Sequence, residues 1–109
     1  MKKVLVIKSD CMGENSELGR KLMIAFLSTL AISDSTPKSI YLLNRGVFLS
    51  TTNEESILIF KKLEEKGVKI YSCQTCLNAF SLMESLKVGE VGNMQGVVGA
   101  LLEEDSVVL

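Results

Sequence analysis

Short, nearly continuous apolar runs alternate along this chain with longer stretches in which apolar residues recur every three or four positions. Residues 4–7 (VLVI) and 39–43 (SIYLL) are runs of the first kind, which are typical of strands buried on both faces of a sheet. Between them, a helical stripe predicts an amphipathic helix capped by Asn15 or Ser16; its apolar members are Leu18, Leu22, Met23, Phe26, Leu27 and Leu30. The first part of the chain therefore predicts a strand, a helix and a second strand.

The second half of the chain repeats this order. A capping box formed by Thr52 and Glu55 predicts a helix over residues 53–66, and Gly67 supplies its left-handed end. There follow a strand at 68–72, a helix at 75–87, a glycine-rich segment, a helix from 93 to 102 and a strand at 107–109. Strands that alternate with helices pair in parallel, so we expect an α/β fold with helices on both faces of the sheet.

Length and charge narrow the class of protein. The 109 residues are enough for one domain, residues 1–109, whose core needs neither a disulfide nor a structural metal. With 12 basic against 13 acidic side chains and no basic run, the sequence argues against nucleic acid or an anionic membrane as partner. No apolar run reaches the roughly 18 residues of a membrane span, and no signal peptide is evident, so we expect a cytoplasmic protein with reduced thiols.

All three cysteines fall near the carboxyl ends of predicted strands, where open parallel sheets collect their chemistry. Cys11 follows the first strand, while Cys73 and Cys76 mark the seam between the third strand and the next helix. Three loops are expected to meet at this edge, at residues 10–15, 44–50 and 72–75. The edge is therefore the candidate site.

Activation of a thiol at this seam has to come from its immediate surroundings. A helix start favours thiolate over thiol, so we expect a lowered pKa at Cys73 and Cys76, helped by hydrogen bonds from Gln74 or Thr75. The chain contains no histidine, which excludes a Cys–His mechanism. The remaining activators are the backbone and a cation, with Arg45 and Lys8 as the candidates.

Four interpretations of the cysteine pair compete. Both residues could simply fill space in the core. A zinc site wants four ligands, so the three cysteines would need a carboxylate such as Asp10 or Glu14, or a second subunit. A dithiol–disulfide exchanger fits the CxxC spacing, but a serine replaces the usual preceding aromatic residue and the single proline, Pro37, lies ahead of the motif. A persulfide carrier needs a reactive thiolate and neither metal nor cofactor, and a second thiol lets it release sulfide.

Read in order, five segments cover nearly the whole chain and resemble the DsrE/DsrF-like sulfurtransferase family: VLVIKSDCMG, ELGRKLMIAFLSTL, PKSIYLLNRGVFL, LEEKGVKIYSCQTCLNAFSL and LKVGEVGNM. Within that family they are most similar to the carboxy-terminal domain of YedF, a selenium-metabolism protein. The resemblance implies a three-layer α/β/α fold around a mostly parallel five-stranded sheet, and a homo-oligomer, trimer or hexamer. It implies a relay function with sulfur or selenium as cargo.

The resemblance also implies roles for individual residues. Cys73 is expected to accept the sulfur, and Cys76 to act as a resolving or assisting thiol. A pocket is expected around this pair; its other members are Cys11, Gly13, Asn44, Gly46, Gln74, Thr75, Asn93 and Met94. The expected partners are a TusA-like protein or a cysteine desulfurase. The sequence begins directly at the first strand, without the TusA-like domain of full-length YedF, so either the domain stands alone and its donor acts in trans, or a TusA-like domain has been removed. The chain departs from the family pattern at Gln74, where glycine is usual.

A second class of function stays open, a binding or assembly domain whose cysteines are incidental. The helix around residues 57–60 (ILIF) is apolar over more than half its circumference, which fits either a wide core face or contact with another subunit. Nucleotide binding is disfavoured, because Gly13 and Gly19 match neither the dinucleotide nor the P-loop spacing.

Overall fold

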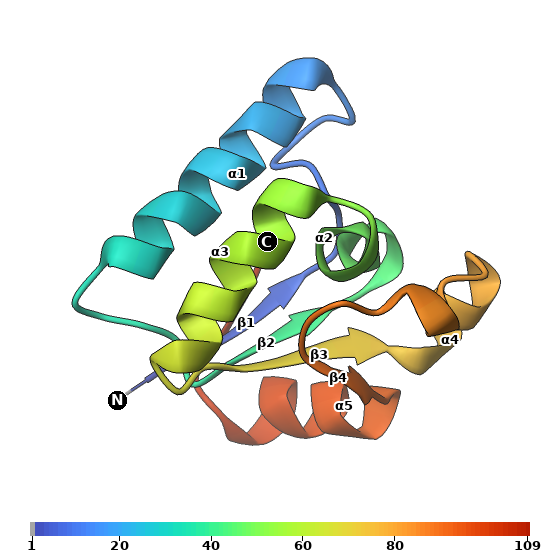
Figure 1. Ribbon diagram of the computed structural model, residues 1–109. Helices are drawn as coiled ribbons and strands as arrows, with labels where there is room; N and C mark the ends of the chain where they lie inside the picture. Colours follow the sequence, from blue (N-terminus) through green and yellow to red (C-terminus); the bar gives the residue numbers. More distant parts are fainter. Residues whose placement is uncertain (1) are drawn as a thin grey trace.

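Five short strands form a single sheet in the order β4-β3-β2-β1-β5, and every neighbouring pair is parallel (Figure 1). The computed structural model describes residues 2–109. Its elements are β1 (Val4–Ile7), α1 (Glu17–Ile32), β2 (Ser39–Leu42), η1 (Asn44–Val47), α2 (Phe48–Thr51), α3 (Glu54–Glu65), β3 (Lys69–Cys73), α4 (Gln74–Ala79), η2 (Met83–Ser85), β4 (Glu90–Gly92), α5 (Met94–Glu103) and β5 (Ser106–Val108). The α/β fold expected from the sequence is confirmed.

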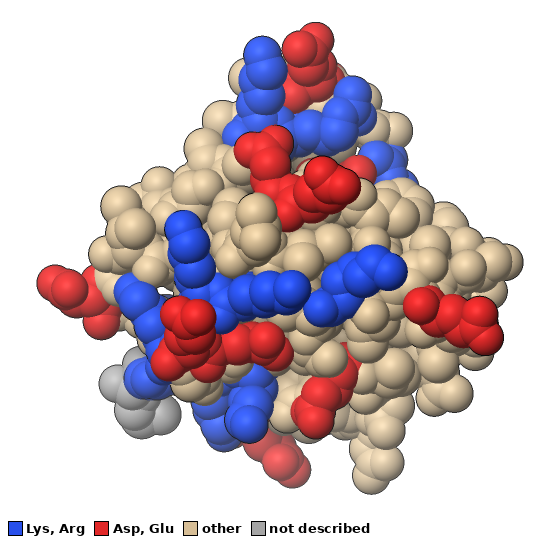
Figure 2. All heavy atoms as spheres, viewed as in Figure 1, with Lys and Arg blue, Asp and Glu red and all other residues tan. Residues whose placement is uncertain are grey.

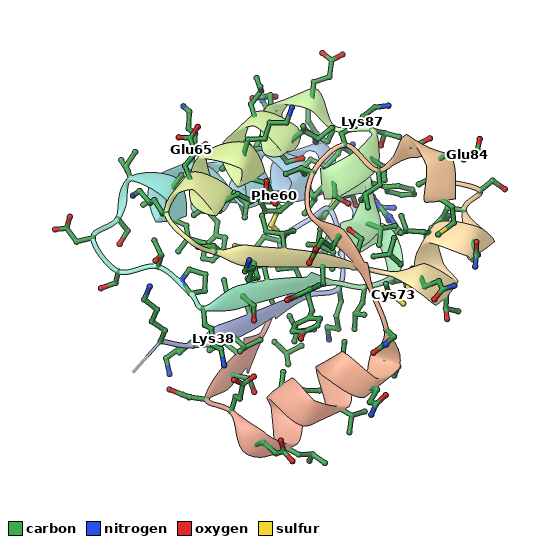
Figure 3. All side chains as sticks on the ribbon, turned by 60° about the horizontal axis from the view of Figure 1, so that its bottom comes forward. Lys38, Phe60, Glu65, Cys73, Glu84 and Lys87 are labelled. Atoms are coloured by element: carbon green, nitrogen blue, oxygen red, sulfur yellow. The ribbon has the colours of Figure 1, made fainter. Side chains whose placement is uncertain are left out.

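Helices cover both faces of the sheet, which makes three layers. Figure 1 shows α1 and α3 crossing one face, while α5 lies against the other. The first face holds most of the core, where fully buried Phe60 packs between α3 and the strands (Figure 3). On the second face the rings of Tyr41 and Tyr71 stack with centroids 5.0 Å apart, and Gly96 lets α5 approach the first of them. The four residues of β1 are all buried, as a continuous apolar run predicts.

Two of the expected helices differ from those observed. The cap of α3 is Asn53, whose side chain accepts a hydrogen bond from the Ser56 N–H at 3.0 Å, so the capping box starting at Thr52 is wrong. The segment before it, expected as a loop, is the helical pair η1 and α2. The helix expected at 75–87 ends at Ala79, because Ser81 adopts a left-handed conformation (φ 58°) and η2 follows. Gly67, with φ +92°, ends α3 as predicted.

The glycine-rich segment, in which the sequence pattern predicted no strand, contains the edge strand β4. In the parallel register with β3, Tyr71 lies opposite Glu90 and Cys73 lies opposite Gly92. A side chain at Gly92 would place its Cβ 2.9 Å from the Cβ of Tyr71, so the strand passes β3 too closely for any other residue. This close pairing brings the residues after β4 to the edge where Cys73 lies.

The apolar stretch of α3 faces mainly inwards. Ile57 and Phe60 are buried, whereas Leu58 is 63% exposed. This burial pattern fits a wide apolar face packed into the core rather than an additional apolar face exposed to solvent. Four of the exposed apolar side chains, Met94, Val98, Leu101 and Leu102, lie at helical spacing on α5, and three others, Leu18, Leu22 and Ile32, lie on α1.

Charged side chains of both signs intermix on the face that carries α1 and α3, and neither sign forms a continuous patch there (Figure 2). Within residues 2–109, no helix combines the length and the apolar character that crossing a membrane requires.

Candidate functional site

Cys73 is the last residue of β3 and the N-cap of α4, at the end of the sheet opposite Lys38 (Figure 3). Its backbone is extended (φ −60°, ψ 124°), and the residue is only 5% exposed. Cys76 lies in the first turn of α4 and is half-buried, and both thiols are free. Gln74 and Thr75 were expected to donate hydrogen bonds to the thiols, but both side chains are exposed and α4 has no side-chain cap.

The turn after β2 supplies a hydrogen bond to this pair. The backbone N–H of Asn44 donates to the Cys76 Sγ at 3.0 Å. Asn44 has φ 50°, a left-handed conformation that asparagine tolerates better than most residues. Two residues later, a Cβ on Gly46 would lie 2.4 Å from the Ile7 carbonyl oxygen, so the turn lies directly against the end of β1. The predicted site residues Asn44, Gly46, Cys73 and Cys76 are thus brought together.

Burial, followed by the neighbouring Cys73 thiol, raises the pKa of Cys76 above its ordinary value; the Asn44 N–H opposes this shift by favouring the thiolate. The sequence led us to expect a lowered pKa at this position. The expectation was wrong for Cys76 because burial of the thiol, which a helix-start argument does not contain, outweighs the donors that favour the thiolate. Cys76 is therefore a protonated thiol at neutral pH, held by one backbone donor.

Cys11 lies in a separate polar cluster at the end of β1. Its thiol donates to Asp10 Oδ1 (3.6 Å) and Asn15 Oδ1 (3.8 Å), and the residue is 4% exposed. The Arg45 guanidinium donates to the same two oxygens, at 2.6 and 2.9 Å, and its Nη2 lies 4.0 Å from the Cys11 Sγ. Arg45, expected as a cation for the cysteine pair, is therefore engaged by the β1 loop instead.

A hydrogen bond between two buried serine hydroxyls lies next to the cysteine pair. The Ser50 and Ser72 hydroxyl oxygens lie 2.6 Å apart, and the Ser50 hydroxyl also donates to the Val47 carbonyl at 3.1 Å. The proton between the two serines therefore comes from Ser72. This contact joins α2 to β3 one residue before Cys73. Nothing in the sequence singled it out, because a serine in a strand and a serine in a loop carry no common motif.

The other predicted pocket residues are more dispersed. Asn93 follows the Gly92 that pairs with Cys73, but its side chain accepts from the Gly96 N–H at 2.9 Å and so caps α5. Met94 is 53% exposed. Gly13 has φ +81° and no atom of another segment within 4 Å of an added Cβ, so it lies on the outer side of its loop.

A groove of about 610 Å³ lies at the other end of the sheet, and it contains none of the predicted site residues; its walls are Lys2, Lys3, Leu5, Phe26, Leu30, Asp34, Ser35, Thr36 and Pro37. In the described part of the chain, no three cysteine or carboxylate side chains gather in a way that could hold a metal ion.

Comparison with known proteins identifies the fold and the family. Two solved structures, each 19% identical to this chain, share its fold: the ychN protein from E. coli (TM-score 0.64, all of this chain and 98% of that one) and the protein of unknown function MTH1491 from Methanobacterium thermoautotrophicum (TM-score 0.68, all of both chains). No curated protein sequence gives a significant match. The family model described as DsrE/DsrF-like matches residues 2–109. The chain belongs to the DsrE/DsrF-like family.

Proposed function

We propose that this protein is a sulfur relay in which the Cys73–Cys76 pair accepts a sulfur atom from a donor protein, carries it as a persulfide on Cys73 and passes it on. The observation that carries the proposal is the Asn44 N–H···Cys76 Sγ hydrogen bond of 3.0 Å at the carboxyl end of β3. It places a second thiol, held by the backbone, in the turn that Cys73 opens. Membership of the DsrE/DsrF-like family, which is commonly linked to sulfur relay, supports the same function.

The surroundings of the pair favour reversible sulfur chemistry over a structural role. Both thiols are free, and Cys76 is partly exposed, so a partner can reach its sulfur, whereas Cys73 is only 5% exposed. A persulfide forms when a thiolate attacks the outer sulfur of a donor persulfide, a reaction that depends on access and on the thiolate fraction of the attacking group. Neither step requires a metal or an organic cofactor.

The finer points of the relay are also proposals. The donor is a TusA-like protein or a cysteine desulfurase, the branch is that of YedF, and selenium is the alternative cargo. We further propose a homo-oligomer, trimer or hexamer. The exposed apolar stripe on α5 supports assembly, because isolated apolar side chains on a surface are common but four at helical spacing on one face are not.

The experiment is mass spectrometry of the intact protein and its peptides after incubation with a cysteine desulfurase and cysteine. Wild type is expected to gain one sulfur atom, mapped to the peptide that contains Cys73 and Cys76. The double variant Cys73→Ser/Cys76→Ser is expected to gain none. Cys11→Ser serves as the matched control, because it removes one buried thiol from a different cluster and should still gain the sulfur.

Two results would contradict the relay. A folded wild-type protein that never gains sulfur from the desulfurase or from a TusA-like donor would refute it. Equal sulfur uptake by the double variant would show that the modification is nonspecific. Circular dichroism of each variant confirms that the fold persists.

A further inference from the structure

We propose that Cys76 is a resolving thiol: it attacks the persulfide on Cys73 and releases the carried sulfur as hydrosulfide, leaving a Cys73–Cys76 disulfide, with Asn44 as the residue that positions it. The inference rests on the proposed relay and specifies one fate of its cargo. It assigns Cys76 the role of a resolving thiol rather than an assisting one, because an assisting thiol would leave the persulfide on Cys73 in place.

The positions of the two cysteines allow this bond. Residues three apart in a helical turn have Cβ atoms about 5–6 Å apart, so a disulfide, which needs about 3.5–4.5 Å, requires the two residues to move closer by about 1–2 Å. Cys73 is the cap of α4 and Cys76 completes its first turn. The contact between the two thiols is already close enough for Cys73 to influence the protonation of Cys76.

Asn44 fixes the direction of the Cys76 sulfur. Its N–H donates to the Cys76 Sγ at 3.0 Å and stabilises the thiolate when it forms. In this turn Asn44 is left-handed at φ 50°, and Gly46 lies directly against the Ile7 carbonyl oxygen. The donor is a backbone N–H, so any substitution that preserves the left-handed conformation also preserves the hydrogen bond. Asn44 is therefore a positioning residue.

The step balances without an external oxidant. The Cys76 thiol gives its proton to water, and the thiolate attacks the Sγ of Cys73. A Cys73 Sγ–Cys76 Sγ bond forms, the bond from Cys73 Sγ to the carried sulfur breaks, and that sulfur leaves with the electron pair as HS⁻. The Cys76 sulfur is oxidised and the carried sulfur is reduced, while the Cys73 sulfur keeps its oxidation state because it exchanges one S–S bond for another. A dithiol reductant then restores both thiols, by first attacking the more exposed Cys76 sulfur.

The protonation of Cys76 sets the pace of release. Burial and the Cys73 thiol keep the Cys76 pKa above its ordinary value, so little thiolate exists at neutral pH. Release of the carried sulfur is consequently slower at neutral pH than it would be from an unburied thiol. Release should accelerate about tenfold for each pH unit until the pH reaches the pKa of Cys76, because the rate follows the thiolate fraction.

The test loads the protein with a cysteine desulfurase and cysteine, removes both by rapid desalting and follows three quantities over time at several pH values. These are persulfide on the Cys73 peptide, free sulfide, and the Cys73–Cys76 disulfide. Wild type is expected to lose persulfide while gaining equal amounts of sulfide and disulfide. Cys76→Ser is expected to keep the persulfide on Cys73 and to release at least about tenfold less sulfide.

Asn44 is tested by a pair of matched substitutions. Asn44→Val should slow release about tenfold relative to the amount of persulfide loaded on Cys73, because a β-branched residue resists the left-handed conformation. Asn44→Gly, which adopts that conformation freely, should restore release. Ser81→Val imposes the same strain at the other left-handed non-glycine residue, φ 58°, and should leave release unchanged.

The outcomes separate the inference from the function on which it rests. Wild-type persulfide as durable as that of Cys76→Ser, or sulfide without disulfide, would overturn resolution by Cys76 while leaving the relay intact. Sulfur that maps to Cys76 in Cys73→Ser and never to Cys73 in Cys76→Ser would reverse the order of the two thiols and overturn the inference. Absence of sulfur uptake by every form would refute the relay itself.

Discussion

One turn, η1, contacts two cysteines at the carboxyl edge of the sheet and surrounds them in opposite ways. Towards β1, Arg45 joins Asp10 and Asn15 around Cys11, whose thiol donates its proton to their oxygens. Towards β3, the N–H of the preceding Asn44 donates to the sulfur of Cys76. The first arrangement uses the cysteine as a donor in a closed cluster, whereas the second leaves a partly exposed sulfur that accepts.

This difference shows that position at a strand end does not by itself make a cysteine a reaction centre. Both regions have the topological placement that favours chemistry in open α/β sheets. What separates them is the direction of the hydrogen bond and the exposure of the sulfur. Only the β3 side combines a second thiol, a backbone donor and access from solvent, which is why the relay is assigned there.

The largest effect is expected where both regions depend on the same contact. Gly46→Ala puts a Cβ 2.4 Å from a backbone oxygen of β1, so we expect it to lower the free energy of unfolding by about 2–3 kcal/mol. Urea unfolding measures this, and thiol labelling should accelerate at both Cys11 and Cys76. Gly99→Ala is the control, because no atom lies within 4 Å of its added Cβ; within α5 it should stabilise by about 0.5–1 kcal/mol. Equal stability of the two variants would contradict the close packing of the turn.

A smaller effect should separate the two regions. Arg45→Met removes an ion pair whose side chains are 30% and 15% exposed, and we expect a loss of about 1–2 kcal/mol. Alkylation of Cys11 should become several-fold faster, with little change at Cys76. The control Lys3→Met breaks an ion pair with Asp105 whose side chains are about half exposed, so its cost should stay below about 0.5 kcal/mol. An Arg45 variant that exposes both thiols equally would show that the two clusters are coupled.

The smallest effect is expected from the Ser50–Ser72 hydrogen bond next to the cysteine pair. Ser72→Ala removes the proton that the Ser50 oxygen accepts, and we expect a cost of about 1 kcal/mol in the free energy of unfolding together with faster alkylation of Cys76. Thr29→Ala is the matched control, because it also deletes a hydroxyl hydrogen bond but on an exposed face of α1. If Ser72→Ala alters stability but leaves Cys76 unaffected, the hydroxyl pair stabilises the fold without positioning the site.

The sequence predicts the architecture better than the detail of the site. Apolar runs located β1, β2 and β3, and Gly67 correctly marked the end of α3. The strand β4 was missed because its three residues contain a single apolar side chain; its pairing depends on the neighbouring β3 rather than on a pattern of its own. The length of α4 was overestimated because leucines at helical spacing continue past the left-handed Ser81.

At the site, the sequence indicated the residues but not their contacts. The sequence predicted a loop at residues 44–50 beside the cysteines, yet it showed neither the left-handed φ of Asn44 nor the close packing of Gly46 against Ile7. The pKa of Cys76 depends on burial by residues distant in sequence, which a helix-start argument does not contain. In the sequence Arg45 was a candidate cation for the cysteine pair, and only the fold shows that it pairs with Asp10 instead.

The most direct test of the contrast between the two regions is competitive alkylation of the native protein by a small reagent, with each cysteine quantified by peptide mass spectrometry from pH 7 to pH 10. We predict that Cys76 reacts at least about tenfold faster than Cys11 at every pH. Its rate should rise to a midpoint above the ordinary thiol value, because burial and the Cys73 thiol raise the Cys76 pKa. Cys11 reacting as fast as Cys76 before unfolding would contradict the assignment of the reactive site to the end of β3.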